Sequence, residues 1–160
     1  MTAGGRGRDE LLQAVGAALR RTIVGVVVFN HQVVERLRLG ANEGQFLNLL
    51  ELHGALTPGQ LAEHTGLGTG TVSGVLDRLE RAGYARRERG SDDRRKVIVT
   101  LDRDRVGREI LPLYAGQDRR VNELLERYAD GELAVIADFL QRLAATGEKA
   151  PPPAPGPSDG

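Results

Sequence analysis

Residues 57–83 constrain the fold of this chain more than any other stretch. They open with Thr57 and Pro58, and Gln60 stands three positions after the threonine. Threonine and glutamine at this spacing form a capping box, in which two side chains satisfy two backbone N–H groups at the start of a helix, and proline suits the first helical position. The pattern therefore predicts a short helix over residues 58–65.

A second helix is predicted to follow a turn at Gly66 and to begin near Thr69. Its apolar residues recur at the i, i+3, i+4, i+7 spacing of a helix with one buried face. This stripe consists of Val72, Val75, Leu76 and Leu79. In the first helix, Leu61 and Ala62 are expected to face inward. Glycine suits the left-handed conformation that ends many helices, so we expect the second helix to end at Gly83. Two helices joined by a short turn form a helix-turn-helix.

Two short strands are predicted directly after the second helix, over residues 84–89 and 96–101. The later run contains Val97, Ile98 and Val99, whose β-branched side chains favour extended backbone. A hairpin here makes the unit a winged helix-turn-helix, whose second helix is placed to enter a major groove of DNA. The predicted fold class is mostly α with a small β-hairpin wing, flanked by N- and C-terminal dimerisation helices.

A long helix is predicted over residues 9–39, with Asp9 as its cap and Gly40 at its end. Its stripe residues are three or four positions apart, so they stay on one face for about seven turns. The stripe consists of Leu12, Val15, Leu19, Ile23, Val26, Asn30, Val33 and Leu37. A helix this long cannot bury both ends in a chain of 160 residues. We expect it to pack against another surface, such as a second copy of the chain.

A third helix is predicted over residues 42–53, with Asn42 as its cap, so that the winged unit spans about residues 42–101. It supplies several apolar side chains and is expected to form the floor of the unit. After the wing, Asp102 or Asp104 is suited to cap another long helix.

This C-terminal helix is predicted to run to about Ala129, and Asp130 and Gly131 are expected to break it. Pro112 lies inside the helix, and because proline removes a backbone donor, we expect a kink there. The final helix is predicted over residues 132–145.

The chain is expected to form one domain over residues 9–146, in which the helices over about 9–39 and 104–146 dimerise. Residues 1–8 are rich in glycine and arginine, and residues 147–160 contain the run PPPAPGP. Both compositions are typical of disordered tails. The simplest interpretation of the C-terminal tail is a spacer.

Charge is unevenly distributed, although 22 basic and 22 acidic residues give a formal net charge of zero. Residues 69–96 contain eight basic and five acidic side chains, so they carry an excess of three positive charges. A basic unit on an acidic body is typical of a nucleic-acid binder with a separate dimerisation region. The alternative interpretation is a charged face that is simply solvated.

Several protein classes are disfavoured by what the sequence lacks. It contains no cysteine, so disulfides, zinc–thiolate sites and thiol redox sensors are excluded. It has no glycine-rich phosphate loop and no nucleophile elbow, and Ser73 has no neighbouring histidine, so we expect neither an enzyme nor a cofactor. His53 and His64 have no acid pair at ligand spacing, so we expect no metal site.

A cytoplasmic location without a membrane span is also expected. The longest apolar run, residues 23–29, is far shorter than the ~20 residues that cross a bilayer. The polar N-terminal residues do not have the pattern of a signal peptide.

The sequence resembles the MarR family of bacterial transcription regulators over about residues 9–143. Three passages carry the resemblance, namely the two-helix core, the wing with its Asp-Arg pair, and the polar break before the final helix. They are residues 61–62, 71–73 and 79–84, residues 91–101, and residues 130–133. The resemblance implies a homodimer with intertwined terminal helices. It also implies binding to a palindromic operator in double-stranded DNA, and repression that a small aromatic or anionic effector relieves.

Arg94 is the strongest candidate for a DNA contact in the wing, where it is suited to reach a minor groove or a phosphate. Asp93 is expected to orient the Arg94 guanidinium through a charge-assisted hydrogen bond. Arg95 and Lys96 are expected to add phosphate contacts, which position a protein on DNA without selecting a sequence. The structural alternative is a solvated hairpin turn.

The second helix supplies hydroxyl groups and one long cation that are suited to bind bases or phosphates. Its candidate DNA-binding residues are Thr69, Thr71, Ser73, Gly74 and Arg78. For Arg78 the structural alternative is a surface salt bridge with Asp77 or Glu80. Gly70 and Gly74 stand where the family commonly has longer polar side chains, which favours close backbone approach or recognition of DNA shape. They also motivate an alternative function, a protein-interaction module without sequence-specific DNA binding.

Asn30 and His31 interrupt the apolar run of the first long helix. If they lie at the junction of the dimerisation body and the winged unit, they are candidates for lining an effector pocket. The structural alternative is a hydrogen bond across the dimer or an exposed ring.

Overall fold

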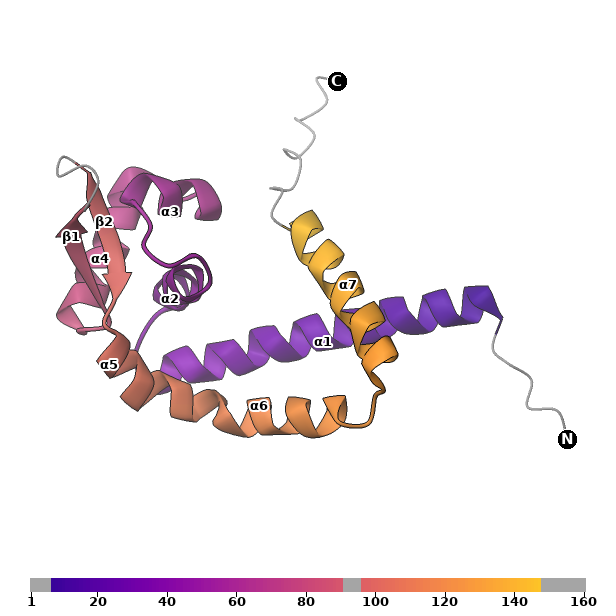
Figure 1. Cartoon of the computed structure of the whole chain (residues 1–160). Helices are drawn as coiled ribbons and strands as arrows, with labels where there is room; N and C mark the ends of the chain where they lie inside the picture. Colours follow the sequence, from indigo (N-terminus) through magenta and orange to yellow (C-terminus); the bar gives the residue numbers. More distant parts are fainter. Residues whose placement is uncertain (1–6, 91–95, 148–160) are drawn as a thin grey trace, which may run out of the picture. The chain divides into compact units, whose positions relative to one another are not determined.

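The computed structural model describes residues 7–90 and 96–147. The predicted tails lie outside these residues except for Gly7, Arg8 and Gly147, of which Arg8 and Gly147 are helical. The elements in chain order are α1 (Arg8–Arg36), α2 (Ala41–His53), α3 (Pro58–Thr65), α4 (Thr69–Arg81), β1 (Ala85–Arg89), β2 (Val97–Leu101), α5 (Arg103–Arg105), the π-helix η1 (Val106–Ile110), α6 (Leu111–Leu125) and α7 (Asp130–Gly147) (Figure 1). The chain divides between Leu113 and Tyr114 into two compact units.

The helix-turn-helix forms from the local signals that predicted it. The backbone N–H of Gln60 donates to Thr57 Oγ1 at 3.2 Å, and the N–H of Thr57 donates to Gln60 Oε1 at 2.8 Å, which confirms the capping box. Helix α3 ends at Thr65, and the Gly66 that caps it is left-handed, with a φ of 69°. Helix α4 begins at Thr69, as predicted.

Gly83 ends α4 with a pair of backbone hydrogen bonds that requires a left-handed residue. Its φ is 76°, its N–H donates to the Glu80 carbonyl at 2.9 Å, and the N–H of Tyr84 donates to the Leu79 carbonyl at 3.0 Å. This is a Schellman motif, so the predicted C-terminal stop is confirmed.

The wing is an antiparallel hairpin in which Ala85 pairs with Leu101 and Arg89 with Val97. Leu56 adds an isolated antiparallel bridge to the hairpin through two backbone hydrogen bonds to Val99, at 3.2 and 2.7 Å. The segment that enters α3 is therefore tied to the wing, and both predicted strands are confirmed to within one residue.

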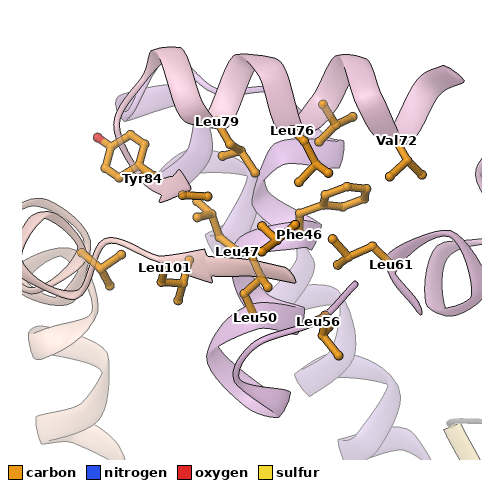
Figure 2. Packing of buried hydrophobic residues seen from close by; sticks show 14 residues of the cluster. Phe46, Leu47, Leu50, Leu56, Leu61, Val72, Leu76, Leu79, Tyr84 and Leu101 are labelled. Atoms are coloured by element: carbon orange, nitrogen blue, oxygen red, sulfur yellow. The ribbon is translucent and has the colours of Figure 1, made fainter. Parts of the chain in front are cut away.

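One hydrophobic core joins α2, α3, α4 and both strands (Figure 2). Its fully buried side chains are Phe46, Leu50, Leu61, Val72, Val75, Leu76, Leu79 and Val99. The whole predicted stripe of α4 belongs to this set. Because α4 buries all four stripe residues, its opposite face is left for solvent or a ligand.

The predicted end of α1, at residue 39, was wrong, whereas the predicted bounds of α2 agree with the structure to within one residue. Helix α1 ends at Arg36, and Arg38 takes the left-handed conformation with φ 57°. The N–H of Arg38 donates to the Glu35 carbonyl at 2.9 Å and the N–H of Leu39 donates to the Val34 carbonyl at 2.8 Å, so a non-glycine residue completes the Schellman motif.

The predicted caps of these two helices also differ from the structure. Gly7, not Asp9, precedes α1, and Gly40, not Asn42, precedes α2; neither helix has a side-chain cap. Gly40 is therefore the N-cap residue of α2 rather than the end of α1. A Cβ at Gly40 would lie 2.5 Å from Glu43 Oε2, so this position accommodates a close carboxylate.

The segment after the wing begins as predicted and then changes its hydrogen-bond register. Asp102 Oδ1 accepts from the Arg105 N–H at 2.9 Å, which confirms Asp102 as the cap. The turn that follows is π-helical, and the Leu111 N–H donates to the Val106 carbonyl, five residues back. Pro112 has no N–H to donate to the carbonyl four residues back, and the wider π-helical turn lies just before it. The predicted kink at Pro112 stays a prediction.

The break between the last two helices lies earlier than predicted. Helix α6 ends at Leu125 rather than near Ala129. Asp130, which was predicted to interrupt the helix, is instead the first residue of α7. Helix α7 can begin at Asp130 because Glu132 Oε2 accepts from the Ala129 N–H at 2.9 Å, which satisfies a backbone donor at the start of the helix.

Large apolar side chains remain exposed on α1, and α6 and α7 carry others. On α1, Ile23 is 54% and Val27 is 63% exposed, while Val33 and Val34 near the C-terminal end are buried. Helix α1 is also long and apolar enough by composition to cross a bilayer, with a mean hydropathy of 1.6 over its most apolar window. The search for uninterrupted apolar runs in the sequence did not identify this property of α1, because polar residues are scattered among its apolar ones.

Candidate nucleic-acid interface

The outer face of α4 carries the side chains that the sequence assigned to DNA. Thr69, Thr71, Ser73 and Arg78 are exposed and Gly74 is half-buried, all away from the core stripe. Their predicted placement on the solvent side of the helix is confirmed, and their contact with DNA stays a prediction.

Two glycines make part of this face flat. A Cβ at Gly70 would meet nothing within 4 Å, and one at Gly74 would meet only Arg78 Nη1, at 3.5 Å. Side chains would therefore fit at both positions, so packing within the chain does not require glycine there. A surface without side chains allows close approach of the helix backbone to a flat partner.

Arg78 is paired, but not with the neighbours that the sequence indicated. Its Nε donates to Glu43 Oε1 on α2, and the Glu43 residue is 4% exposed. A buried carboxylate needs a charged or hydrogen-bonding partner because it has lost its water. Arg78 therefore ties α4 to α2, while half of its side chain remains in solvent.

Asp77 and Glu80 are instead held by Arg87, a residue of β1 that sequence reasoning did not select. Arg87 Nη1 lies 2.8 Å from Asp77 Oδ1 and also pairs with Glu80, and its backbone N–H donates to Glu80 Oε1 at 2.7 Å. Its Nη2 donates to the Ser73 carbonyl at 3.3 Å. The sequence shows an excess of arginines in this region, but no local pattern indicates which of them contacts α4.

The wing contributes one predicted contact residue to the described structure. Lys96 is exposed next to the last rung of the hairpin, where its carbonyl accepts from the Gly90 N–H at 2.9 Å. Asp93, Arg94 and Arg95 lie outside the described residues. Their roles stay predictions from the sequence.

The candidate effector residues lie on α1. Asn30 is half-buried, and His31 is exposed with its Nε2 3.3 Å from Glu35 Oε1. An open groove elsewhere is lined by Arg38, Glu43 and Arg78, among others, and contains neither residue. A ligand site at Asn30 and His31 stays a prediction.

A buried tyrosine connects the end of α4 to the segment after the wing. Tyr84 donates from its hydroxyl to Glu109 Oε2 at 2.7 Å, and the Arg105 guanidinium lies 4.9 Å from the ring centroid. Burial, and then the bond to Glu109, raises the pKa of Tyr84. The same hydrogen bond is the main reason that the pKa of Glu109 is lowered.

His53 of α2 and His64 of α3 lie against each other. Their rings stack with centroids 4.8 Å apart and planes 20° apart. Within residues 7–90 and 96–147, no group of three potential metal ligands occurs.

Comparisons with known proteins agree on one kind of regulator. Residues 39–96 match the family model described as "MarR family". The HTH-type transcriptional regulator YcgE of Bacillus subtilis, itself uncharacterised, is 32% identical over 137 residues, which cover 86% of this chain and 88% of YcgE. The HTH-type transcriptional repressor YetL of the same organism is 30% identical over 115 residues, covering 66% of this chain and 67% of YetL.

The fold matches solved structures as well. A MarR family protein from Bacillus stearothermophilus superimposes with a TM-score of 0.64 at 22% identity, covering 90% of this chain and all of that one. Since this likeness extends over the flanking helices as well as the winged unit, it supports the predicted fold class along nearly the whole chain.

Proposed function

Because the chain belongs to the MarR family of HTH-type transcriptional regulators, we propose that it acts as a homodimer on a palindromic operator and represses transcription until a small-molecule effector binds. Regulators of this family bind DNA. The repressor role is suggested by the name of its relative YetL. The same family membership supports a role in binding rather than catalysis and a location in the cytoplasm.

The face of α4 is the observation that carries the DNA-binding part of the proposal. We name α4 the recognition helix, since its apolar stripe is wholly buried and its other side presents Thr69, Thr71, Ser73 and Arg78 to solvent. Hydroxyl groups and one arginine on a helix of 13 residues suit a major groove.

The exposed apolar face of α1 supports the homodimer. Ile23, Val24 and Val27 are each more than half exposed, and covering apolar area is worth about 25 cal/mol per Å². A bilayer would also cover such a face, but a transcription factor must reach DNA, and a second copy of α1 offers the same apolar residues in return. We also propose that Asn30 and His31 contribute to the effector site, because they are polar residues within the apolar run of the same helix.

The test is a titration of DNA with the purified full-length chain. A duplex selected by the protein from a random-sequence pool is titrated at several salt concentrations, and the mass of the complex gives its stoichiometry. We expect two chains per duplex and affinity that falls steeply with salt. Arg94→Ala is expected to weaken binding by ~1–3 kcal/mol, and Arg142→Ala, which removes an exposed arginine from α7, to leave it unchanged.

Failure of the wild-type chain to select any duplex at low salt would contradict the proposal. It would favour the alternative of a winged-helix module that binds another protein. Selection of a non-palindromic duplex by a monomer would contradict the homodimer alone.

A further inference from the structure

We propose that Arg87 is a positioning residue that fixes the wing against the recognition helix and does not itself contact DNA. The inference rests on the DNA-binding function proposed above. It concerns how the two elements proposed to contact DNA, α4 and the hairpin β1–β2, keep a fixed orientation relative to each other.

The Arg87 side chain reaches from β1 to three positions on a single face of α4. Its guanidinium contacts the carboxylates of Asp77 and Glu80 and the carbonyl of Ser73. These three positions are four and three residues apart, so they lie one above another along the helix. A planar group that bonds all three acceptors is restrained in both position and direction along α4.

The main chain of the wing is held by the same contact. Glu80 accepts from the Arg87 side chain through one oxygen and from the Arg87 backbone N–H through the other, at 2.7 Å in the second case. Arg87 also faces Val99 in the hairpin register, and Val99 is completely buried. A shift of the wing relative to α4 would therefore break a bidentate contact and disturb the core.

The Arg87 side chain is also a poor candidate for a phosphate contact. It is only 28% exposed, and both of its terminal nitrogens already have acceptors on α4. Its neighbour on the strand, Arg86, is 55% exposed and pairs with Asp102 at 3.0 Å, away from the recognition helix.

A simpler role for Arg87 would be to cancel charge. Asp77 and Glu80 are acids on the recognition helix, and uncompensated they would repel phosphates. Lysine would cancel this charge equally well, but its ammonium lacks the planar fork that bonds several acceptors in fixed directions. Arg87→Lys therefore separates positioning from neutralisation.

The experiment compares Arg87→Lys and the matched control Arg86→Lys with the wild-type full-length chain on the selected duplex. Affinity is measured by titration, and the contacts are mapped by hydroxyl-radical footprinting. We expect Arg87→Lys to weaken binding by about tenfold, equivalent to 1.4 kcal/mol. We also expect it to lose the protections made by the wing while those made by the recognition helix persist at saturating protein. Arg86→Lys should change neither result.

Two outcomes would overturn the inference. Wild-type affinity and footprint for Arg87→Lys would show that positive charge alone is required. A uniform loss of all protections, together with a thermal midpoint well below that of Arg86→Lys, would show a general folding role. If the wild-type chain bound no duplex, the proposed function itself would fail, and the two failures are therefore distinguishable.

Discussion

The winged unit and the long helix α1 that precedes it differ in the burial of their apolar side chains. In the winged unit, side chains from α2, α3, α4 and the hairpin bury one another (Figure 2). Phe46 and Val75 have no exposed surface. On α1, by contrast, Val24 and Val27 are 63% exposed, although they belong to the most apolar stretch of the chain.

Apolar content alone therefore does not locate a core. Several short elements can surround a common interior, because their stripes face one another at close range. A single helix of 29 residues extends beyond any interior that a small unit can provide. The winged unit is therefore expected to be stable on its own contacts, while α1 depends on a partner.

The strongest loss of stability should come from a substitution in the core of the winged unit. Phe46→Ala removes a side chain with no exposed surface and should lower the free energy of unfolding by ~3–5 kcal/mol. Leu52→Ala is the control on the same helix, since Leu52 is 75% exposed, and should change the free energy by less than about 0.5 kcal/mol. Urea unfolding measures both. Equal effects of the two substitutions would contradict the position of the core.

The second effect should fall on association rather than on the winged unit. Ile23→Asp places a charge in the exposed stripe of α1 and should weaken dimerisation by at least about 2 kcal/mol. Sedimentation equilibrium measures the dissociation constant, and Arg21→Asp, at an exposed polar position nearby, is the control. An unchanged dimer in Ile23→Asp would remove the contrast between the two regions.

A smaller effect tests whether local backbone signals contribute to the winged unit. Gly83→Ala forces a Cβ into a left-handed residue and to within 2.8 Å of Arg105 Nη1, so it should destabilise the chain by ~1–2 kcal/mol. Gly59→Ala, within α3 and free of clashes, should instead stabilise it by about 0.4–1 kcal/mol. Thermal unfolding of both variants checks the opposite signs, and a destabilised Gly59→Ala would be the contrary result.

The smallest effect concerns the contact between Tyr84 and Glu109. The pKa of Glu109 is lowered in the folded chain, chiefly by the hydrogen bond from Tyr84, so the ionised carboxylate stabilises the fold. This contribution is present above the ordinary pKa of 4.5 and is lost as pH falls through the lower folded value.

Glu109→Gln should therefore be less stable than the wild-type chain near pH 7, and the difference should shrink as the pH falls below 4.5. Urea midpoints measured from pH 7 down to pH 3 follow this convergence. A difference that stayed constant over the whole range would show that the carboxylate charge contributes nothing.

Several elements could be predicted from the sequence because they depend only on residues close together in the chain. The capping box of Thr57 and Gln60, the stripe from Val72 to Leu79 and the stop at Gly83 each involve residues within one or two helical turns. Such signals act through the local backbone, so they can be recognised in the sequence before the packing is known. The same pattern placed Thr69, Thr71, Ser73 and Arg78 on the open face of α4.

The pairing of charged side chains, by contrast, depends on how whole elements pack together. Arg78 pairs with Glu43, 35 residues away, and Arg87 with Glu80 across the junction of helix and wing. Local pattern also failed at Arg38, which takes a left-handed conformation that glycine usually supplies. In each case the packing of whole elements fixes which groups come within reach, and that packing is a property of all the contacts together rather than of any short stretch.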